Sequence, residues 1–226
     1  RDGGNYPCGM AKAQATGEAQ WILSADEYSS LAAFKRSTDE EETTQRYKAT
    51  GLVQSLGMRL KLPQTTIATA QVFLHRFYIR ETFKAFPSAE LAPAVVFLAS
   101  KVEEHPRKLK DVLHDSPLSP ERVLQLEKII LQTVCFDLTV THPYRFVFRI
   151  VKGLRDVPDE LVQSAWIVVN DSYRTTLCIR VPSKSVAAGA FCYAAEKKGL
   201  DVASLAADAV TDQLILDCPR AEVQGS

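Results

Sequence analysis

Apolar residues recur every three or four positions along most of this 226-residue chain, which is the period of an amphipathic helix. In the first half, this pattern predicts five helices, over residues 38–62, 63–78, 88–102, 108–114 and 119–136. Thr38 and Glu41 form a capping-box pattern at the first start, and Ser119 followed by Pro120 marks the last. Residues 92–102 are apolar on nearly every face, so we expect this helix at the centre of a bundle.

The second half repeats this plan. Pro143 opens a helix, residues 162–169 indicate another, and a third is expected from Ser183 to Lys198. At a constant offset of 95 residues, Ala70, Tyr78, Pro87-Ser88, Ala92 and Ala99 match Ala165, Tyr173, Pro182-Ser183, Ala187 and Ala194. Several matches at one offset indicate a duplicated unit. The sequence therefore predicts an all-α fold of two tandem five-helix bundles.

The two ends of the chain depart from the bundle pattern. Residues 1–20 contain four glycines and no apolar period, so we expect a flexible N-terminal arm there. Residues 201–226 are too few to copy the last two helices, so the second bundle is expected to be reduced or incomplete in this sequence. The start, Arg1 followed by a polar stretch, is unlike a secretory leader.

Charge and composition narrow the function classes. Lys plus Arg and Asp plus Glu both number 27, and this zero net charge argues against a protein that coats nucleic acid. The apolar run at 91–100 is too short to cross a membrane. Five widely spaced cysteines favour reduced thiols over a disulfide framework, so we expect a soluble intracellular protein.

Motifs for catalysis and cofactor binding are missing from the sequence. There is no phosphate loop, dinucleotide fingerprint, zinc-protease motif or hydrolase elbow. None of the four histidines lies three or four residues from another histidine or a cysteine. We therefore expect no catalytic residue, no cofactor, no metal and no small-molecule substrate, and we interpret the chain as a binding protein.

The residues of the duplicated unit resemble a known family. Residues 99–104 (ASKVEE) look like the third helix of a cyclin box, and residues 75–78 (HRFY) fit the second helix of the same family. Residues 165–172, together with Trp21, are similar to the transcription-type cyclins of the K, T and L groups. The resemblance extends over residues 21–198.

This resemblance implies a domain plan and a function. It implies a first cyclin box with an N-terminal extension at 21–140 and a second cyclin box at 141–226. It also implies a nuclear, non-catalytic activator of a cyclin-dependent kinase acting on the C-terminal repeats of RNA polymerase II. The kinase would form a heterodimer with this chain, with or without a third subunit. Which kinase, and which of the K, T and L groups, stays open.

The resemblance assigns the kinase-binding residues of the family to particular positions of this sequence. Lys101 and Glu127 match the lysine and glutamate that hydrogen-bond the kinase's movable regulatory helix, and Phe97 and Glu104 are further expected kinase-binding residues. A lysine only donates and a carboxylate only accepts, so together they suit backbone carbonyl and N–H groups. The offset pairs Lys101 with Glu196, so only the first box is expected to bind the kinase. The alternative to this interpretation is a solvated lysine at a helix end and a surface glutamate favoured by its helix dipole.

Other functions remain open on the sequence alone. A general transcription factor of the TFIIB type also has two cyclin-like repeats, but it predicts a basic second repeat and a zinc ribbon, and neither pattern is present. A helical adaptor without a kinase is a second alternative. Arg145, Arg149 and Lys152 form a basic stripe, which is either a solvated face or a docking surface for an acidic or phosphorylated peptide.

Overall fold

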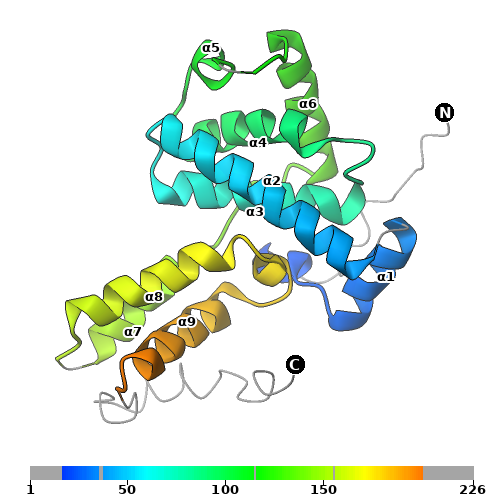
Figure 1. Cartoon of the computed structure of the whole chain (residues 1–226). Coiled ribbons are helices and arrows are strands. Elements are labelled where there is room, and N and C mark those ends of the chain that lie inside the picture. Colours follow the sequence, from blue (N-terminus) through cyan, green and yellow to red (C-terminus); the bar gives the residue numbers. More distant parts are fainter. Residues whose placement is uncertain (1–16, 36–37, 115, 155, 201–226) are drawn as a thin grey trace. The chain divides into compact units, whose positions relative to one another are not determined.

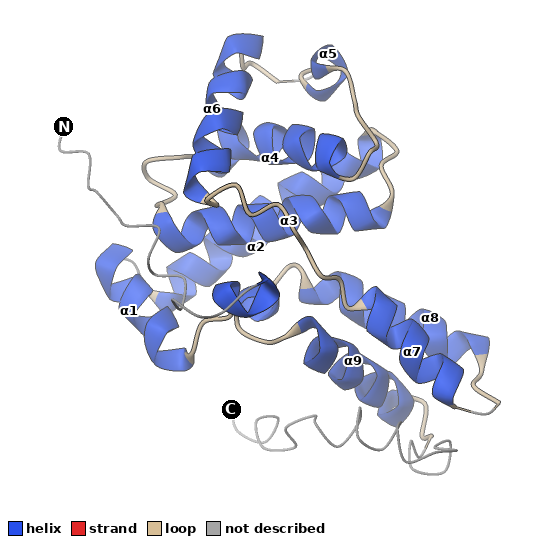
Figure 2. Ribbon diagram, turned by 180° about the vertical axis from the view of Figure 1, so that it is seen from behind, coloured by secondary structure: helices blue, strands red, loops and turns tan. Residues whose placement is uncertain are grey.

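The computed structural model of the chain describes residues 17–35, 38–114, 116–154 and 156–200. All regular structure in these ranges is helical, which confirms the predicted all-α fold class (Figure 2). Most of the predicted arm, residues 1–16, lies outside the described residues, as do residues 201–226. The described helices include none that is long and apolar enough to cross a membrane.

The chain divides into two units. The first contains the described residues up to Val140 together with Tyr173–Arg180, and the second contains Thr141–Ser172 with the described residues from Val181 onward. The elements of the first unit are η2 Gly17–Trp21, α1 Ala25–Lys35, α2 Asp39–Arg59, α3 Gln64–Arg80, α4 Ser88–Val102, α5 Leu109–Val112, α6 Pro120–Thr133 and η3 Thr176–Ile179 (Figure 1). All five helices predicted for the first half are present as α2 to α6.

Local sequence signals start these helices. The Thr38 hydroxyl accepts a hydrogen bond from the Glu41 N–H at 3.1 Å, and the Glu41 carboxylate accepts one from the Thr38 N–H at 3.0 Å. This reciprocal capping box satisfies two of the N–H groups that have no partner within a helix. At α6, Ser119 accepts from the Arg122 N–H at 3.2 Å, and Pro120 occupies the first turn.

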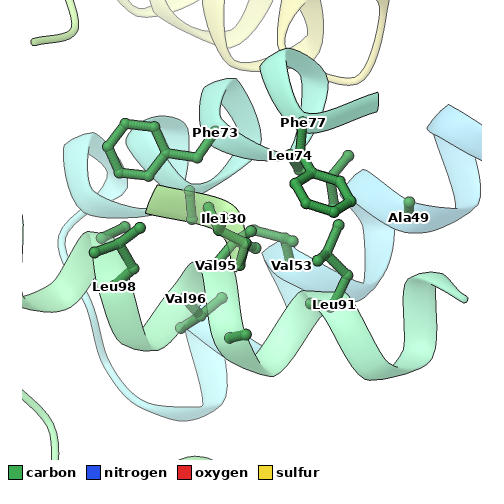
Figure 3. Packing of buried hydrophobic residues seen from close by; sticks show 14 of the residues in the cluster. Ala49, Val53, Phe73, Leu74, Phe77, Leu91, Val95, Val96, Leu98 and Ile130 are labelled. Atoms are coloured by element: carbon green, nitrogen blue, oxygen red, sulfur yellow. The ribbon is translucent and has the colours of Figure 1, made fainter. Parts of the chain in front are cut away.

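Helix α4 lies at the centre of the first unit, as its all-round apolar pattern predicts. It packs against α2, α3, α5 and α6. Helix α3 is also buried over most of its length, since it packs against α2, α4, α6 and η3. The core shown in Figure 3 is built from Ala49 and Val53 of α2, Phe73, Leu74 and Phe77 of α3, Leu91, Val95, Val96 and Leu98 of α4, and Ile130 of α6.

The end of α6 differs from the prediction. The apolar pattern continues to Phe136, but the helix ends at Thr133. Cys135 and Phe136 adopt φ angles of 54° and 56°, in the left-handed region that terminates a helix. Their N–H groups bond back to the carbonyls of Gln132 and Leu131 at 3.0 and 2.8 Å. The chain thus turns at this point, and Phe136 remains 66% exposed.

The second unit contains three described α-helices that pack side by side, α7 Tyr144–Gly153, α8 Asp159–Ser172 and α9 Ser183–Lys197 (Figures 1 and 2). Helices α4 and α9 begin 95 residues apart and end 95 residues apart, and α3 and α8 also begin at that offset. The helix bounds therefore reproduce the repeat found in the sequence. Alanines on α9, among them Ala187, Ala190 and Ala194, are buried where the helices pack.

Candidate protein-binding site

Three of the four predicted binding residues lie together where α4 packs against α6. Lys101 is in the last turn of α4, and its ammonium forms an ion pair with the Glu127 carboxylate of α6. Phe97 lies one turn before Lys101, and its ring centroid is 4.3 Å from the same ammonium. The structure thus joins a cation, an anion and an aromatic ring in one surface cluster.

The two charged residues of this cluster differ in exposure. The Lys101 side chain is 43% exposed, whereas the Glu127 side chain is only 11% exposed. Glu127 Oε1 is paired in charge with Lys101 but accepts no hydrogen bond of regular geometry within the described part of the chain. Because an ammonium carries three donors and a carboxylate several acceptor sites, both groups retain capacity for a partner.

The fourth predicted residue, Glu104, is not brought into this cluster. It lies in the turn after α4 with φ of 58°, where its N–H donates to the Lys101 carbonyl at 3.2 Å. Its exposed carboxylate forms no ion pair or hydrogen bond within residues that the structure describes. Glu103 instead faces inward and accepts a hydrogen bond from the Thr69 hydroxyl at 2.7 Å. A binding role for Glu104 stays a prediction.

The described part of the second unit has no equivalent of the cluster. Glu196 takes the place of Lys101 in α9 and is exposed. It forms no ion pair among the described residues, and Phe97 is matched by Cys192 at the same offset. The cation and the aromatic ring are therefore both lost at the corresponding position.

A buried charged network connects α2 with α3, and the sequence analysis did not predict it. Arg46 is only 1% exposed, and its guanidinium donates to the Glu42 carboxylate at 2.9 Å. It also donates to the backbone carbonyls of His75 and Tyr78, at 3.2 and 2.8 Å. The spacing of Glu42 and Arg46, one helical turn, was the available signal, because a polar pair on the apolar stripe of α2 requires a buried partner.

His75 connects this network to the segment Tyr173–Arg180. Its Nδ1 lies 3.1 Å from an Arg46 nitrogen, and its Nε2 lies 3.0 Å from the Tyr173 carbonyl oxygen. A guanidinium only donates and a carbonyl only accepts, so the imidazole is neutral with its proton on Nε2. Burial, reinforced by the Arg46 charge, lowers the pKa of His75 from 6.5 to about 3.

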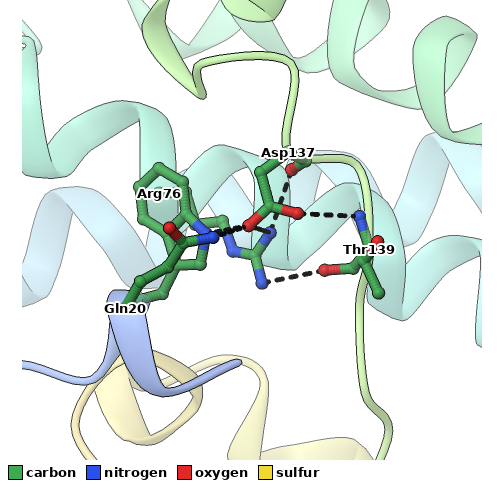
Figure 4. Close-up of polar contacts among 5 residues, drawn as sticks. Gln20, Arg76, Asp137 and Thr139 are labelled. Carbon is green, nitrogen blue, oxygen red and sulfur yellow. Dashed lines mark hydrogen bonds and ion pairs between the residues drawn. The ribbon is translucent and has the colours of Figure 1, made fainter. Parts of the chain in front are cut away.

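Within the first unit, a second network connects η2 to Arg76 of α3 and to the segment that follows α6 (Figure 4). The Asp137 carboxylate accepts hydrogen bonds from the Trp21 indole N–H at 2.6 Å and from the Gln20 amide. Arg76 donates to the backbone carbonyls of Asp137 and Thr139, and its guanidinium lies 4.8 Å from the Trp21 ring centroid. Burial lowers the pKa of Arg76 to about 10, against the opposing effect of the Asp137 charge.

None of these clusters has the composition of a metal site. Within the described ranges, no group of three or more histidine, cysteine, aspartate or glutamate side chains is arranged to hold a metal ion. The cluster around Lys101 instead has the chemistry of a contact to another protein, since it offers donors, acceptors and an aromatic surface together.

Comparison with known proteins gives a family for the first unit. Residues 20–139 match the family model of the cyclin N-terminal domain. The chain is 34% identical to cyclin pch1 of Schizosaccharomyces pombe over 207 residues, which cover 82% of this chain and 60% of pch1. It is 39% identical to human cyclin-K over 158 residues, or 61% of this chain and 27% of cyclin-K. It is also 39% identical to cyclin-T1-5 of Arabidopsis thaliana over 178 residues, or 70% of this chain and 31% of that protein.

Solved structures share the fold. A chain of the yeast RNA Pol II CTD kinase complex CTDK-1 superposes with a TM-score of 0.71 and 19% identity, covering 87% of this chain and 71% of that one. A chain of the Chaetomium thermophilum CAK complex bound to ATP-γ-S gives a TM-score of 0.72 and 20% identity, covering 94% of this chain and 79% of that one. A chain of yeast TFIIK, a complex of Kin28, Ccl1 and Tfb3, gives 0.69 and 18%, covering 90% and 96%. The sequence relatives are longer, because this chain spans 60% of pch1 and about a third of cyclin-T1-5.

Proposed function

The chain belongs to the cyclin family, and we propose that it is the non-catalytic, activating subunit of a cyclin-dependent kinase. In this proposal the first cyclin box, residues 21–140, contacts the kinase, and the second box is formed by residues 141–226. Lys101, Glu127 and Phe97 form the contact, with Glu104 at its edge. The partner is a kinase polypeptide, so no cofactor, membrane or nucleic acid takes part in the contact.

The observation that carries this proposal is the cluster of Lys101, Glu127 and Phe97 on the surface of the matched domain. Its ion pair keeps the Glu127 charge compensated, and the exposed ammonium keeps free donors. A partner's backbone segment offers carbonyl oxygens to Lys101 and N–H groups to Glu127. These backbone groups are present whatever side chains the partner carries, so the cluster holds a segment through its main chain.

The energy of this contact matches the task of activation. Hydrogen bonds to charged groups contribute about 1.5–3 kcal/mol each, so Lys101 and Glu127 together provide about 3–6 kcal/mol. Moving a kinase from 1:99 to 99:1 in favour of its active state requires about 5.5 kcal/mol of differential binding. Fixing the regulatory helix completes the Lys–Glu ion pair of the kinase, which is needed to position the phosphates of ATP.

The relatives support a more specific assignment within this proposal. The relatives are cyclins named pch1, K and T, and the fold neighbours come from CTDK-1, CAK and TFIIK complexes. We therefore assign the chain to a nuclear kinase that phosphorylates the C-terminal repeats of RNA polymerase II. TFIIK contains three proteins, so a third subunit is compatible with the assembly.

Reconstitution with purified kinases tests the proposal. The chain is mixed with candidate cyclin-dependent kinases, and phosphorylation of a peptide carrying the polymerase repeat is measured. We expect at least tenfold activation of one kinase, and a loss of about tenfold or more in Lys101→Ala and in Glu127→Gln. Lys108→Ala is the matched control, because it removes an exposed lysine outside the cluster and leaves activation unchanged. Failure to bind or activate any kinase of this class overturns the proposal.

A further inference from the structure

Helix α7 of the second unit carries a basic and aromatic stripe. Arg145, Phe148, Arg149 and Lys152 occupy positions i, i+3, i+4 and i+7, so they share one face of the helix. All four side chains are exposed, and Phe148 is 55% exposed. The residues of the kinase contact proposed above all belong to the first unit, so this stripe is not part of that contact.

The stripe points away from the packed side of α7. Tyr144, Val147 and Ile150 form the buried face, through which α7 packs against α8 and α9. The helix contains no acidic residue, and within the described ranges none of its three cations forms an ion pair. Arg145 and Arg149 instead lie over the Phe146 ring, at 5.1 and 5.8 Å from its centroid. Among the residues that the structure describes, no ion pair therefore compensates the charge of this face.

The exposed Phe148 ring packs against other aromatic residues of the second unit. Its ring meets Trp166 of α8 edge to face, at 6.0 Å and 87°. Trp166 in turn stacks on Tyr144, at 4.6 Å and 23°. Ile167, the next residue of α8, is 60% exposed. An exposed aromatic residue held by other rings, with cations beside it, has the composition of the central part of a protein interface.

We propose that the α7 stripe is a docking surface for an acidic peptide segment of a partner protein, with an apolar side chain of that segment resting on Phe148. Arg145 and Lys152 are separated by about 10 Å along the helix axis, which is the length of about three residues of extended chain. Carboxylates spaced along such a segment can each meet one cation. The partner thus needs acidic residues on both sides of an apolar one.

The arrangement of the cations selects this occupant over two others. A single phosphate is held by donors that converge on one point, whereas Arg145 and Lys152 start from positions two helical turns apart on α7. A nucleic acid is favoured by an extended basic field, whereas the chain as a whole has zero net charge and Asp159 and Glu160 begin the adjacent helix α8. Charge complementarity at separated points therefore fits a carboxylate-rich peptide.

Fluorescence polarisation with the full chain tests the docking surface without any kinase. The probe is a short fluorescein-labelled peptide with a pair of Asp residues on each side of a central Leu, and its control has Asn in place of every Asp. The first variant is Arg145→Gln, Arg149→Gln and Lys152→Gln combined. Its matched control is Lys48→Gln, Lys108→Gln and Lys110→Gln combined, which removes the same charge from exposed lysines of the first unit. A second variant, Phe148→Ser, removes the aromatic surface alone.

We expect the Asp peptide to bind at least tenfold more tightly than the Asn peptide. The stripe variant should weaken binding at least tenfold and Phe148→Ser about threefold or more, while the control variant binds as the wild type does. Equal loss in both charge variants, or no loss in the stripe variant, overturns the proposal. So does tighter binding of a peptide carrying one phosphoserine and no Asp, or of a single-stranded oligonucleotide. Because no kinase is present, these results are independent of the proposed kinase contact.

Discussion

Removing the buried imidazole of His75 tests whether the α2–α3 network excludes a proton. Nδ1 faces a donor of Arg46, and Nε2 already donates to the Tyr173 carbonyl. A second proton would therefore remove one hydrogen bond and place a new positive charge beside a guanidinium. The Glu42 carboxylate is already bonded to Arg46. We expect the free energy of unfolding of His75→Gln to lack the pH dependence that His75 contributes in the wild type.

The magnitude follows from the two pKa values. The unfolded chain binds the proton of His75 with a pKa near 6.5, whereas the folded chain binds it only near 3. Between these values the unfolded state holds more protons, so stability falls as the pH falls. The contribution of neutral His75 is complete above pH 6.5, and about 2 kcal/mol of it is lost at pH 5. At pH 8, His75→Gln should destabilise the first unit by about 1–3 kcal/mol, because Arg46 and Tyr173 lose a fitted partner.

Urea unfolding at pH 8 and pH 5 measures both the destabilisation by His75→Gln and its change with pH. Trp21 lies in the first unit and Trp166 in the second, so a Trp166→Phe background lets tryptophan fluorescence report the first unit alone. The free energy of unfolding is compared between His75 and His75→Gln at each pH and equal ionic strength. His105→Gln is the matched control, since it makes the same chemical change at an exposed histidine.

The free energy of unfolding of the wild type should exceed that of His75→Gln at pH 8, and we expect this difference to shrink by about 2 kcal/mol at pH 5. A difference that stays constant within about 0.5 kcal/mol would show that the folded protein accepts the proton, and the description of the network would then be wrong. The same shrinkage in His105→Gln would also contradict it.

Four further substitutions have defined outcomes in the same unfolding assay. Gly51→Ala should stabilise α2 by about 0.5–1 kcal/mol, because a Cβ there meets nothing within 4 Å. Gly57→Ala should instead destabilise the first unit, because its Cβ would lie 2.5 Å from Ile67. Equal effects of the two substitutions on the free energy of unfolding would refute the packing of Gly57 against Ile67. Arg46→Met should cost about 3–5 kcal/mol, since it removes the guanidinium that is paired with the buried Glu42 carboxylate, and a loss below about 1 kcal/mol would contradict this. Asp137→Leu should cost about 1–3 kcal/mol by leaving the Trp21 indole N–H without its acceptor, and should red-shift the tryptophan emission; an unchanged emission maximum would contradict it.

Much of the fold follows from short-range signals in the sequence. Caps at Thr38 and Ser119, apolar periodicity and the all-round apolar character of 92–102 correctly predict α2 to α6 and the central place of α4. The helix bounds of α4 and α9 agree with the 95-residue repeat. The resemblance to cyclins of the K, T and L types is confirmed by the sequence relatives. The caps and the apolar periodicity depend only on neighbours within one or two helical turns.

Other features depend on residues far apart in the chain. The end of α6 was missed because two consecutive residues in left-handed conformation, Cys135 and Phe136, leave no mark on an apolar pattern. His75 and Tyr173 are 98 residues apart, and Trp21 and Asp137 are 116 apart, so neither bond follows from local spacing. For the candidate site, the family resemblance indicated both Lys101 and Glu127, whereas their direct pairing emerged only from the packing of α4 on α6. Their role in kinase binding stays a prediction.

The most direct test of the proposed kinase contact exchanges its two charges. In the double variant Lys101→Glu with Glu127→Lys, the ion pair within the chain is kept, but the donor and the acceptor offered to a partner change places. A purely structural pair would tolerate this exchange, and the melting temperature reports whether the fold is kept. We predict that the exchanged protein melts within about 3 °C of the wild type and activates the partner kinase at least tenfold less. A folded double variant that activates the kinase as well as the wild type does would contradict the central claim.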